Sequence, residues 1–243
     1  MHHVRLLLFL PFMLVLLGSC AQRGGETPDA PPPPSSAAEA AASDDWVTLF
    51  DGTGTDNWRM YNGGTLTGWE VADGELRASG AGWDADQDLI TRDAYDDFEF
   101  EAEWKLEAGQ SSGIFYHVQP SADQPIYESA PEYQVIDATG WSDPLEPNQL
   151  TAGNYAMHAP ENATPKPVGE WNTTRIVVRY PRVEHWLNGQ KVVDYTLGDE
   201  DWQARKAAGK WKDVTDYGTA RSGHIGLQNA GKVAYRNVRI REL

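Results

Sequence analysis

The chain has 243 residues, a length that allows one all-β domain of about 200–250 residues or two smaller domains. Its 36 Asp and Glu residues outnumber its 20 Lys and Arg residues, so the net charge is −16. This charge argues against a nucleic acid partner and gives no support for adsorption to anionic lipid. The ten Trp and ten Tyr residues suit the faces of sugars, and they equally suit the core of a β-sandwich.

Residues 1–20 have the pattern of a bacterial lipoprotein signal peptide. A short, positively charged start precedes an apolar run at residues 6–17, which is too short to span a bilayer comfortably. The sequence Leu17-Gly18-Ser19-Cys20 that follows is similar to a lipobox, whose cysteine is acylated and becomes the mature N-terminus. An ordinary signal peptide with an incidental cysteine is the alternative. The pattern predicts a protein of the bacterial cell envelope, periplasmic or on the cell surface, that touches the membrane through its lipid anchor only.

Residues 21–43 are expected to be a linker. They are rich in Pro, Ala and Ser, and include four consecutive prolines at positions 31–34, a composition that cannot build a core. A Pro-rich chain extends about 3.1 Å per residue, so this segment reaches roughly 70 Å at most. We therefore expect a spacer followed by one folded domain at residues 44–243.

Short β-rich runs separated by turn residues fill the folded part. We predict strands at residues 46–50, 69–71, 75–78, 88–91, 98–106, 114–118, 133–136, 175–180, 183–187, 191–195, 224–228 and 232–240. Asp73-Gly74 and Asn188-Gly189 are strong hairpin turn signals. A helix is expected at 199–212 with Asp199 as its N-cap. This pattern predicts an all-β jelly roll, a sandwich of two antiparallel sheets with one short helix.

The strand at residues 98–106 has two contrasting faces. Phe98, Phe100, Ala102, Trp104 and Leu106 alternate with Glu99, Glu101, Glu103 and Lys105. The apolar face is expected to pack on a second sheet, and the charged face to be a solvated wall, with a binding cleft as the alternative. The turn that follows is expected at residues 109–113, and the next strand is expected to place Phe115 and His117 on one face.

Residues 138–170 show no convincing periodic element and contain five prolines. A loop this long inside a domain is usually functional, so residues beside it are candidates for a site.

An ordered series of short motifs resembles the 3-keto-disaccharide hydrolase family over about residues 46–243. The motifs are Leu49-Phe50-Asp51-Gly52, Asp97-Phe98, Glu103-Trp104-Lys105, Ser112-Gly113-Ile114-Phe115-Tyr116, Glu132-Tyr133-Gln134-Val135-Ile136-Asp137, Gly169-Glu170-Trp171-Asn172, His185-Trp186-Leu187-Asn188-Gly189, Gly226-Leu227-Gln228 and Arg236-Asn237. The resemblance implies a concanavalin A-like, laminin G-like jelly roll, a carbohydrate substrate, and cleavage of glycosides oxidised to a ketone at sugar carbon 3. Members of the family often carry Asp-His-Gly where this chain has Asn229-Ala230-Gly231, so no role for that histidine is carried over.

This chemistry sets what the site must contain. A ketone at C3 acidifies the hydrogen on C2, so a base can remove it, the C1 substituent can leave by elimination, and water can then add. The reaction needs one general base, one general acid and donors that face the enolate. It does not need the two opposed carboxylates of ordinary glycosidases.

The candidate catalytic residues are Glu132, Glu103 and His158. Both glutamates match motif positions of the family, and Glu132 is preferred as the base because it starts a strand beside the long loop; a solvated carboxylate is the alternative for each. His158 in that loop, or else His117 on the sheet, is the candidate acid, and a structural role is the alternative.

The candidate substrate-binding residues are His117, Gln134, Asp137, Trp186 and Gln228. Gln134 shares a face with Glu132 by the period of 2, and Gln228 lies on a strand expected to be adjacent. Trp186 is a candidate for stacking on a pyranose or a core residue, and Asp137 a candidate for binding or for capping a turn.

The sequence carries no metal motif and no cofactor is predicted. Asp84, Asp86 and Asp88 alternate in an acidic loop, which is either plain surface or a Ca²⁺ site. The expected partner is an oxidised (3-keto) sugar or another carbohydrate. A non-catalytic carbohydrate-binding lipoprotein on the same fold is the alternative function, because fold alone does not decide between the two.

Overall fold

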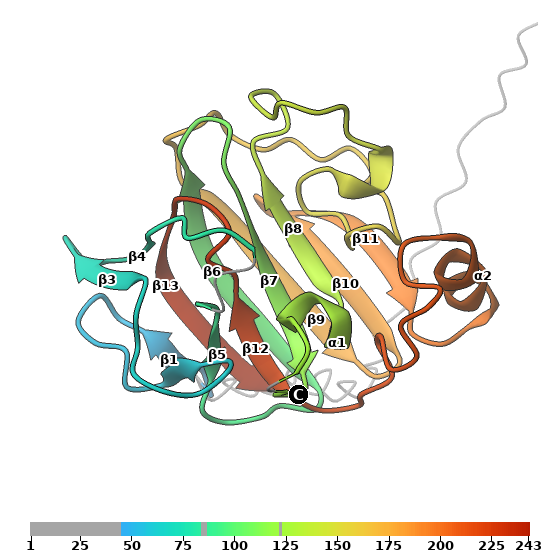
Figure 1. Cartoon of the computed structure of the whole chain (residues 1–243), viewed down its shortest axis with the longest axis horizontal. Coiled ribbons are helices and arrows are strands. Elements are labelled where there is room, and N and C mark those ends of the chain that lie inside the picture. The colour runs from blue at the N-terminus through green and yellow to red at the C-terminus, as the bar shows by residue number, and fades with distance from the viewer. Residues whose placement is uncertain (1–44, 84–86, 122) are drawn as a thin grey trace, which may run out of the picture. The chain divides into compact units, whose positions relative to one another are not determined.

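The computed structural model describes residues 45–83, 87–121 and 123–243 (Figure 1). The predicted signal peptide, Cys20, the linker, Asp84 and Asp86 lie outside the described residues. The described part is a jelly-roll sandwich of two antiparallel β-sheets, as predicted.

The larger sheet has eight strands among the described residues. Their order is β11 (Gln190–Thr196), β10 (Arg182–Leu187), β9 (Asn172–Arg179), β6 (Phe98–Leu106), β13 (Val233–Glu242), β4 (Glu75–Ala78) and β3 (Trp69–Ala72), and β1 (Val47–Phe50) also pairs with β13. Several strands that are neighbours in this sheet are distant in sequence. For example, β6 lies between β9 and β13. The sheet is therefore held together by long-range pairing.

The smaller sheet has five strands in the described chain. Their order is β2 (Trp58–Met60), β5 (Leu89–Thr91), β12 (His224–Leu227), β7 (Ser111–Val118) and β8 (Glu132–Ile136). Figure 1 shows this sheet in front of the larger one, with the long loop after β8 above it. Alternate side chains of both sheets fill the space between them, so one core joins the two layers.

The alternation of apolar and charged residues in β6 gives this strand one face in the core and one face toward solvent. Its predicted apolar residues are at most 5% exposed and lie in the core. The opposite face is a solvated wall, as predicted, in which carboxylates pair across to β13: Glu99 with Arg241, Glu101 with Arg239, and Glu103 with Arg236. The Glu99 carboxylate is buried beneath its arginines, and the other two glutamates are partly exposed. Partly exposed pairs contribute little to stability individually, so the core carries the fold.

The two hairpin signals are confirmed. Asp73 and Gly74 both have positive φ angles, 55° and 76°, and join β3 to β4. Asn188 and Gly189, at 51° and 83°, join β10 to β11. Positive φ at both central residues is the geometry that such short turns need.

The helices differ in part from the prediction. α2 (Glu200–Ala208) begins after Asp199, whose side chain accepts a hydrogen bond from the Trp202 N–H at 2.8 Å, as a cap should. It ends before Lys212, because Gly209 is its C-cap. Two short helical elements were not predicted, α1 (Ile126–Ser129) and the 3₁₀ turn η1 (Pro147–Gln149), since each is too short to carry a helical period. The three-residue strand β2 was not predicted either.

Strand β7 corrects two further predictions. It begins at Ser111 and not at Ile114, so Gly113 lies inside the strand and the turn is shorter than expected. Phe115 and His117 do not share a face: Phe115 packs with Val118 and Ile126 in a small cluster under α1, and the His117 ring packs edge-on against Phe98. The alternation fails because His117 has a φ of +58° and the pairing with β12 shifts there.

Candidate functional site

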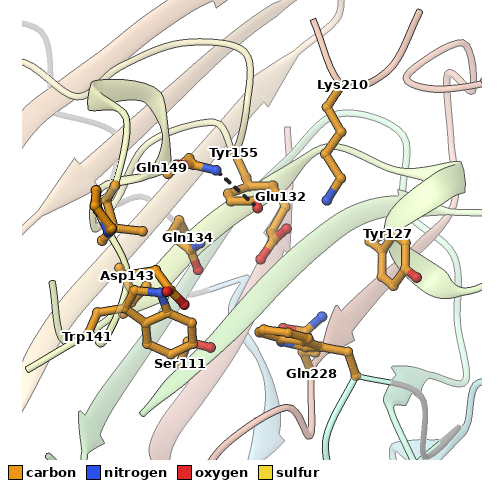
Figure 2. A pocket seen from close by; sticks show the side chains of 14 residues that line it. Ser111, Tyr127, Glu132, Gln134, Trp141, Asp143, Gln149, Tyr155, Lys210 and Gln228 are labelled. Atoms are coloured by element: carbon orange, nitrogen blue, oxygen red, sulfur yellow. Dashed lines mark hydrogen bonds between the residues drawn. The ribbon is translucent and has the colours of Figure 1, made fainter. Parts of the chain in front are cut away.

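A pocket of about 380 Å³ lies on the face of the smaller sheet that points away from the core. β7 and β8, the end of β12, the long loop and the segment after α2 all contribute to it (Figure 2). It is lined by Trp83, Ser111, Tyr127, Glu132, Gln134, Ile136, Trp141, Asp143, Pro144, Leu145, Gln149, Tyr155, Lys210 and Gln228. The volume lies in the range of sites for small molecules, with aromatic walls and a few polar groups.

Strand alternation places Glu132 and Gln134 in this pocket. Tyr133 and Val135 of β8 are fully buried in the core, so their neighbours must point to the opposite side. Glu132 and Gln134 are only 5% and 6% exposed even so, because loops rise around that face. β8 therefore presents a carboxylate and an amide side by side in a nearly enclosed space.

Gly113 makes room for the Glu132 carboxylate. It lies on β7 opposite Gln134, and a Cβ atom built at Gly113 would overlap the Glu132 carboxylate group. The absence of a side chain at this position is thus a steric requirement of the site.

Within the described chain, no hydrogen bond or salt bridge reaches the Glu132 carboxylate, although Glu132 is buried. A buried carboxyl group without a partner is costly in its charged form. Its acceptor atoms are therefore available to a ligand.

The segment Ala152–Tyr155 runs along β8 as an additional edge. Its backbone accepts from and donates to Gln134, and the Tyr155 N–H donates to the Glu132 carbonyl at 3.0 Å. The buried His185 ring of the larger sheet bonds the Ala152 carbonyl at 2.9 Å. The backbone that carries Tyr155 is therefore anchored to both sheets, and its side chain joins Glu132 in the pocket (Figure 2).

Lys210 supplies a positive charge to the pocket. Its ammonium nitrogen lies 4.6 Å from the ring centres of Tyr155 and Trp211 and 5.3 Å from that of Tyr127, a cation–π arrangement. Lys210 is exposed as a residue, but its ammonium group lies against these rings and points toward Glu132 in Figure 2. Burial lowers the pKa of Lys210, and the Glu132 and Glu128 charges oppose that shift.

Burial raises the pKa of Glu132 to about 8. The Lys210 charge lowers this pKa and the Asp88 charge raises it, but both contributions are smaller than that of burial. Burial also raises the pKa of Tyr155, with a smaller contribution from Glu132. Glu132 is thus poised to exchange a proton near neutral pH, which is what a general base or acid requires.

Two amides complete the polar lining. The Gln134 side-chain oxygen accepts a bond from the Val135 N–H at 3.0 Å, so its NH₂ group is the end left to donate. Gln228 follows β12, and its N–H bonds the Gly113 carbonyl at 3.0 Å. Both side chains line the pocket, so oriented donors flank the carboxylate.

Comparison with known proteins assigns the chain to a family. The model of the 3-keto-alpha-glucoside-1,2-lyase-like domain matches residues 45–241. A Bacteroides thetaiotaomicron protein named 3-keto-disaccharide hydrolase is 35% identical over 232 residues, which are 83% of this chain and 79% of that protein. The chain belongs to the 3-keto-disaccharide hydrolase family.

Solved structures agree with this family assignment. A crystal structure from Parabacteroides distasonis, of a protein whose name proposes a glycosyl hydrolase, is 36% identical with a TM-score of 0.77. The match covers 82% of this chain and 94% of the Parabacteroides distasonis chain. A second such structure from the same organism, at 23% identity and a TM-score of 0.63, covers 82% and 99% respectively and supports the fold alone.

Of the residues expected from the family motifs, the structure brings Glu132, Gln134 and Gln228 together in the pocket. Glu103 lies elsewhere, on the outer face of the larger sheet. Its carboxylate accepts bonds from Arg236 at 2.6 Å and Asn237 at 2.7 Å. Burial alone would raise the Glu103 pKa, but these partners outweigh it and lower the pKa. The structure therefore gives Glu103 a place in the charged wall.

The two histidines also lie outside the pocket. His158 stacks on Tyr195 at 4.6 Å, and its nitrogens face Asn154 and Asp201 in a separate groove. Burial lowers the pKa of His158 to about 4. His117 bonds the Asp96 carbonyl at 2.7 Å on the inner side of the smaller sheet.

Asp137 and Trp186 have local partners. The Asp137 carboxylate accepts bonds from the Gly109, Thr139 and Gly140 N–H groups and so caps the start of the long loop, the alternative foreseen for it. Trp186 stacks under the Arg175 guanidinium at 4.0 Å on the outer face of the larger sheet. Neither residue lines the pocket.

Several lining residues had no signal in the family motifs or the strand period. Tyr155 and Trp141 lie in the long loop, which had been singled out only as a whole. Lys210 follows a helix end, where a lysine is ordinarily explained by the helix dipole. Trp83 lies in an irregular loop. Only tertiary packing brings these four residues to β8.

Metal-binding clusters and membrane-spanning helices were also sought among the described residues. No group of three or more His, Cys, Asp or Glu residues there is arranged to hold a metal ion. No helix in that same part of the chain is long and apolar enough to cross a membrane.

Proposed function

We propose that the protein cleaves the glycosidic bond of 3-keto-glycosides, including 3-keto-disaccharides, in the pocket over β8. The observation that carries the proposal is the buried, unpaired Glu132 carboxyl group with a pKa of about 8, facing Lys210 in a pocket lined by sugar-compatible aromatic rings. Two comparisons support it: the curated relative is named 3-keto-disaccharide hydrolase, and the family description names 1,2-lyase chemistry at a 3-keto-glucoside.

In the first step, the Glu132 carboxylate removes the proton from C2 of the keto-sugar. The C–H electrons form a C2–C3 double bond, and the C3 oxygen becomes an enolate. The enolate then re-forms the C3 ketone, the C1–C2 double bond forms, and the bond from C1 to the leaving oxygen breaks. A proton reaches that oxygen, and the leaving group departs as an alcohol.

In the second step, water adds to the unsaturated sugar. Its oxygen bonds to C1 and a proton returns to C2, so the sum of both steps is hydrolysis. Glu132 returns a proton to C2, and Lys210, which gave its proton to the leaving oxygen, takes up the proton that the water loses. One base therefore serves both steps.

The remaining polar groups have matching roles in the proposal. The Gln134 and Gln228 amides donate hydrogen bonds to the oxygen on which the enolate charge develops. Lys210 contributes its positive charge and donates the proton to the leaving oxygen. A lowered pKa makes an ammonium group a better proton donor.

The proposal gives the reaction a defined pH dependence. Glu132 acts as a base only when it is ionised, and its pKa is about 8 in the free protein. The value of kcat/KM should therefore rise with pH up to about 8 and fall again once Lys210 loses its proton.

The test is turnover of 3-keto-trehalose or a 3-keto-glucoside, with the unoxidised sugars as controls. We expect release of the leaving group from the oxidised sugars only, and exchange of the C2 hydrogen in deuterated water. Glu132→Gln should abolish the exchange and lower kcat by about 10²–10⁴-fold. Binding of both kinds of sugar without turnover would favour the alternative, a carbohydrate-binding protein, and full activity of Glu132→Gln would remove this mechanism.

We also propose that the domain works in the bacterial cell envelope, tethered through a lipid on Cys20. The lipobox-like Leu17-Gly18-Ser19-Cys20 and the Pro-rich segment after it support this proposal.

A further inference from the structure

Two tryptophans meet at one end of the pocket. Trp83 is 55% exposed, more than any other large apolar side chain in the described ranges. The Trp141 ring lies 6.1 Å from it at an angle of 45°, and both line the pocket. In Figure 2, Trp141 and Lys210 lie on opposite sides of Glu132 and Gln134. Trp141 is thus separated from the end of the pocket that holds Lys210.

The residues just before Trp83 are held by hydrogen bonds, although they have no regular secondary structure. The Asn229 side-chain oxygen accepts bonds from the Gly80 and Ala81 N–H groups at 2.9 and 3.2 Å, and the Asn229 carbonyl accepts one from the Gly82 N–H at 3.2 Å. Asn229 is 1% exposed and directly follows Gln228. The segment that leads into Trp83 is therefore bonded to the strand end that carries a pocket amide.

The Trp141 loop is anchored in a similar way. Trp141 follows the turn in which the Asp137 carboxylate accepts bonds from the Thr139 and Gly140 N–H groups at 3.2 and 3.0 Å. A Cβ atom at Gly140 would overlap that carboxylate. Both indoles are thus mounted on hydrogen-bonded turns, and their meeting does not need a ligand to order it.

We propose that Trp83 and Trp141 form a subsite for a cyclic leaving group, so that the protein prefers 3-keto-glycosides whose leaving group is a second ring. The C–H groups on the flat face of a pyranose, or the face of an aromatic ring, match an exposed indole, whereas a small alkyl group covers little of it. Asp143 lines the pocket and lies beside Trp141 in Figure 2, where its carboxylate accepts from hydroxyl groups at the ring edge. This inference rests on the proposed function, since it divides that pocket into a keto-sugar end and a leaving-group end.

The test compares kcat/KM for a 3-keto-disaccharide, an aryl 3-keto-glucoside and methyl 3-keto-glucoside. Trp83→Ala should lower kcat/KM about tenfold for the two ring-bearing substrates and leave kcat/KM for the methyl glucoside unchanged. Trp141→Ala should have the same effect. Trp83→Phe should keep most of the activity that Trp83→Ala loses. Trp186→Ala, on the outer face of the other sheet, is the matched control and should change none of the three. A loss confined to the disaccharide would identify a sugar leaving group, and a loss confined to the aryl glucoside an aromatic one.

Two results would overturn the inference: unchanged kinetics in Trp83→Ala, or an equal loss for methyl and ring-bearing substrates. If the wild-type protein turns over no keto-sugar, the proposed function fails, and the subsite is then judged by binding. Titration with the unoxidised disaccharide should quench tryptophan fluorescence in the wild type and not in Trp83→Ala. Absence of quenching in the wild type would overturn the subsite as well.

Discussion

Glu132→Gln should stabilise the protein, and the gain should grow with pH. Burial raises the folded-state pKa of Glu132 from an ordinary value of 4.5 to about 8. At pH values between these two pKa values, Glu132 is ionised in the unfolded chain and keeps its proton in the folded protein. The wild type therefore loses stability as pH rises through this window. A neutral glutamine of the same shape does not titrate, so it escapes this loss.

The size of the effect follows from the two pKa values. Integrating the proton linkage from pH 5 to pH 8 gives about 3.5 kcal/mol for a shift from 4.5 to about 8. Water at the pocket mouth solvates part of the charge, so we expect roughly 2–3 kcal/mol in practice. For a domain of this size that corresponds to a relative rise in Tm of about 5–10 °C.

The assay is thermal or urea unfolding of wild type and Glu132→Gln at several pH values from 5 to 8. Glu103→Gln is the control, because the Glu103 pKa is lowered by its partners. Its stabilising contribution is present above the unfolded pKa and is lost only as pH falls below it, so the effect of Glu103→Gln should be constant across this range. A constant difference for Glu132→Gln as well would show that its carboxyl group titrates normally, and the electrostatic argument for the base would be refuted.

Three other predictions concern the pocket and the anchor. Lys210→Met should lower kcat by about 10²–10⁴-fold. Lys210→Arg should keep substrate binding without restoring kcat, because a guanidinium keeps the charge and does not give up a proton at this pH. Wild-type activity in Lys210→Arg, with loss only in Lys210→Met, would show that only the charge matters. Gly113→Ala should displace the Glu132 carboxylate and lower kcat with little change in unfolding temperature, since Gly113 has no positive φ and the atoms nearest to its added Cβ belong to the Glu132 side chain. Normal turnover would contradict the steric argument. Cys20→Ala should move the protein from the membrane to the soluble fraction after cell fractionation, and unchanged membrane association would contradict the lipid anchor.

The sequence by itself determined most of the strands, turns and the main helix, because these depend on the alternation, turn residues and caps of neighbouring positions. Alternation in residues 98–106 identified the core face and the charged wall of β6 correctly. Asp73-Gly74 and Asn188-Gly189 marked two hairpins, since few residues tolerate the positive φ that these turns need. Asp199 marked the start of α2 through its capping side chain. Where the backbone departs from its period, as at His117, the prediction of faces was wrong.

For the candidate site, the sequence determined the part that lies on strands. The period of 2 put Glu132 and Gln134 on one face of β8, and the family motifs added Gln228. The same motifs also singled out Glu103, and nothing in the sequence revealed that β13 would pair it with Arg236 on the opposite side of the molecule. Strand period gives the face on which a side chain lies, but not the sheet to which that face belongs.

Tertiary structure alone decided which side chains close the pocket and how it is charged. Lys210, Tyr155, Trp83 and Trp141 come from irregular segments that no period describes, and long-range hydrogen bonds bring them to β8. The pKa of Glu132 depends on the same closure, because the carboxyl group is shielded from water only when these segments cover the sheet. A glutamate in a strand is ordinary in sequence, and its surroundings in the folded protein make it a candidate base.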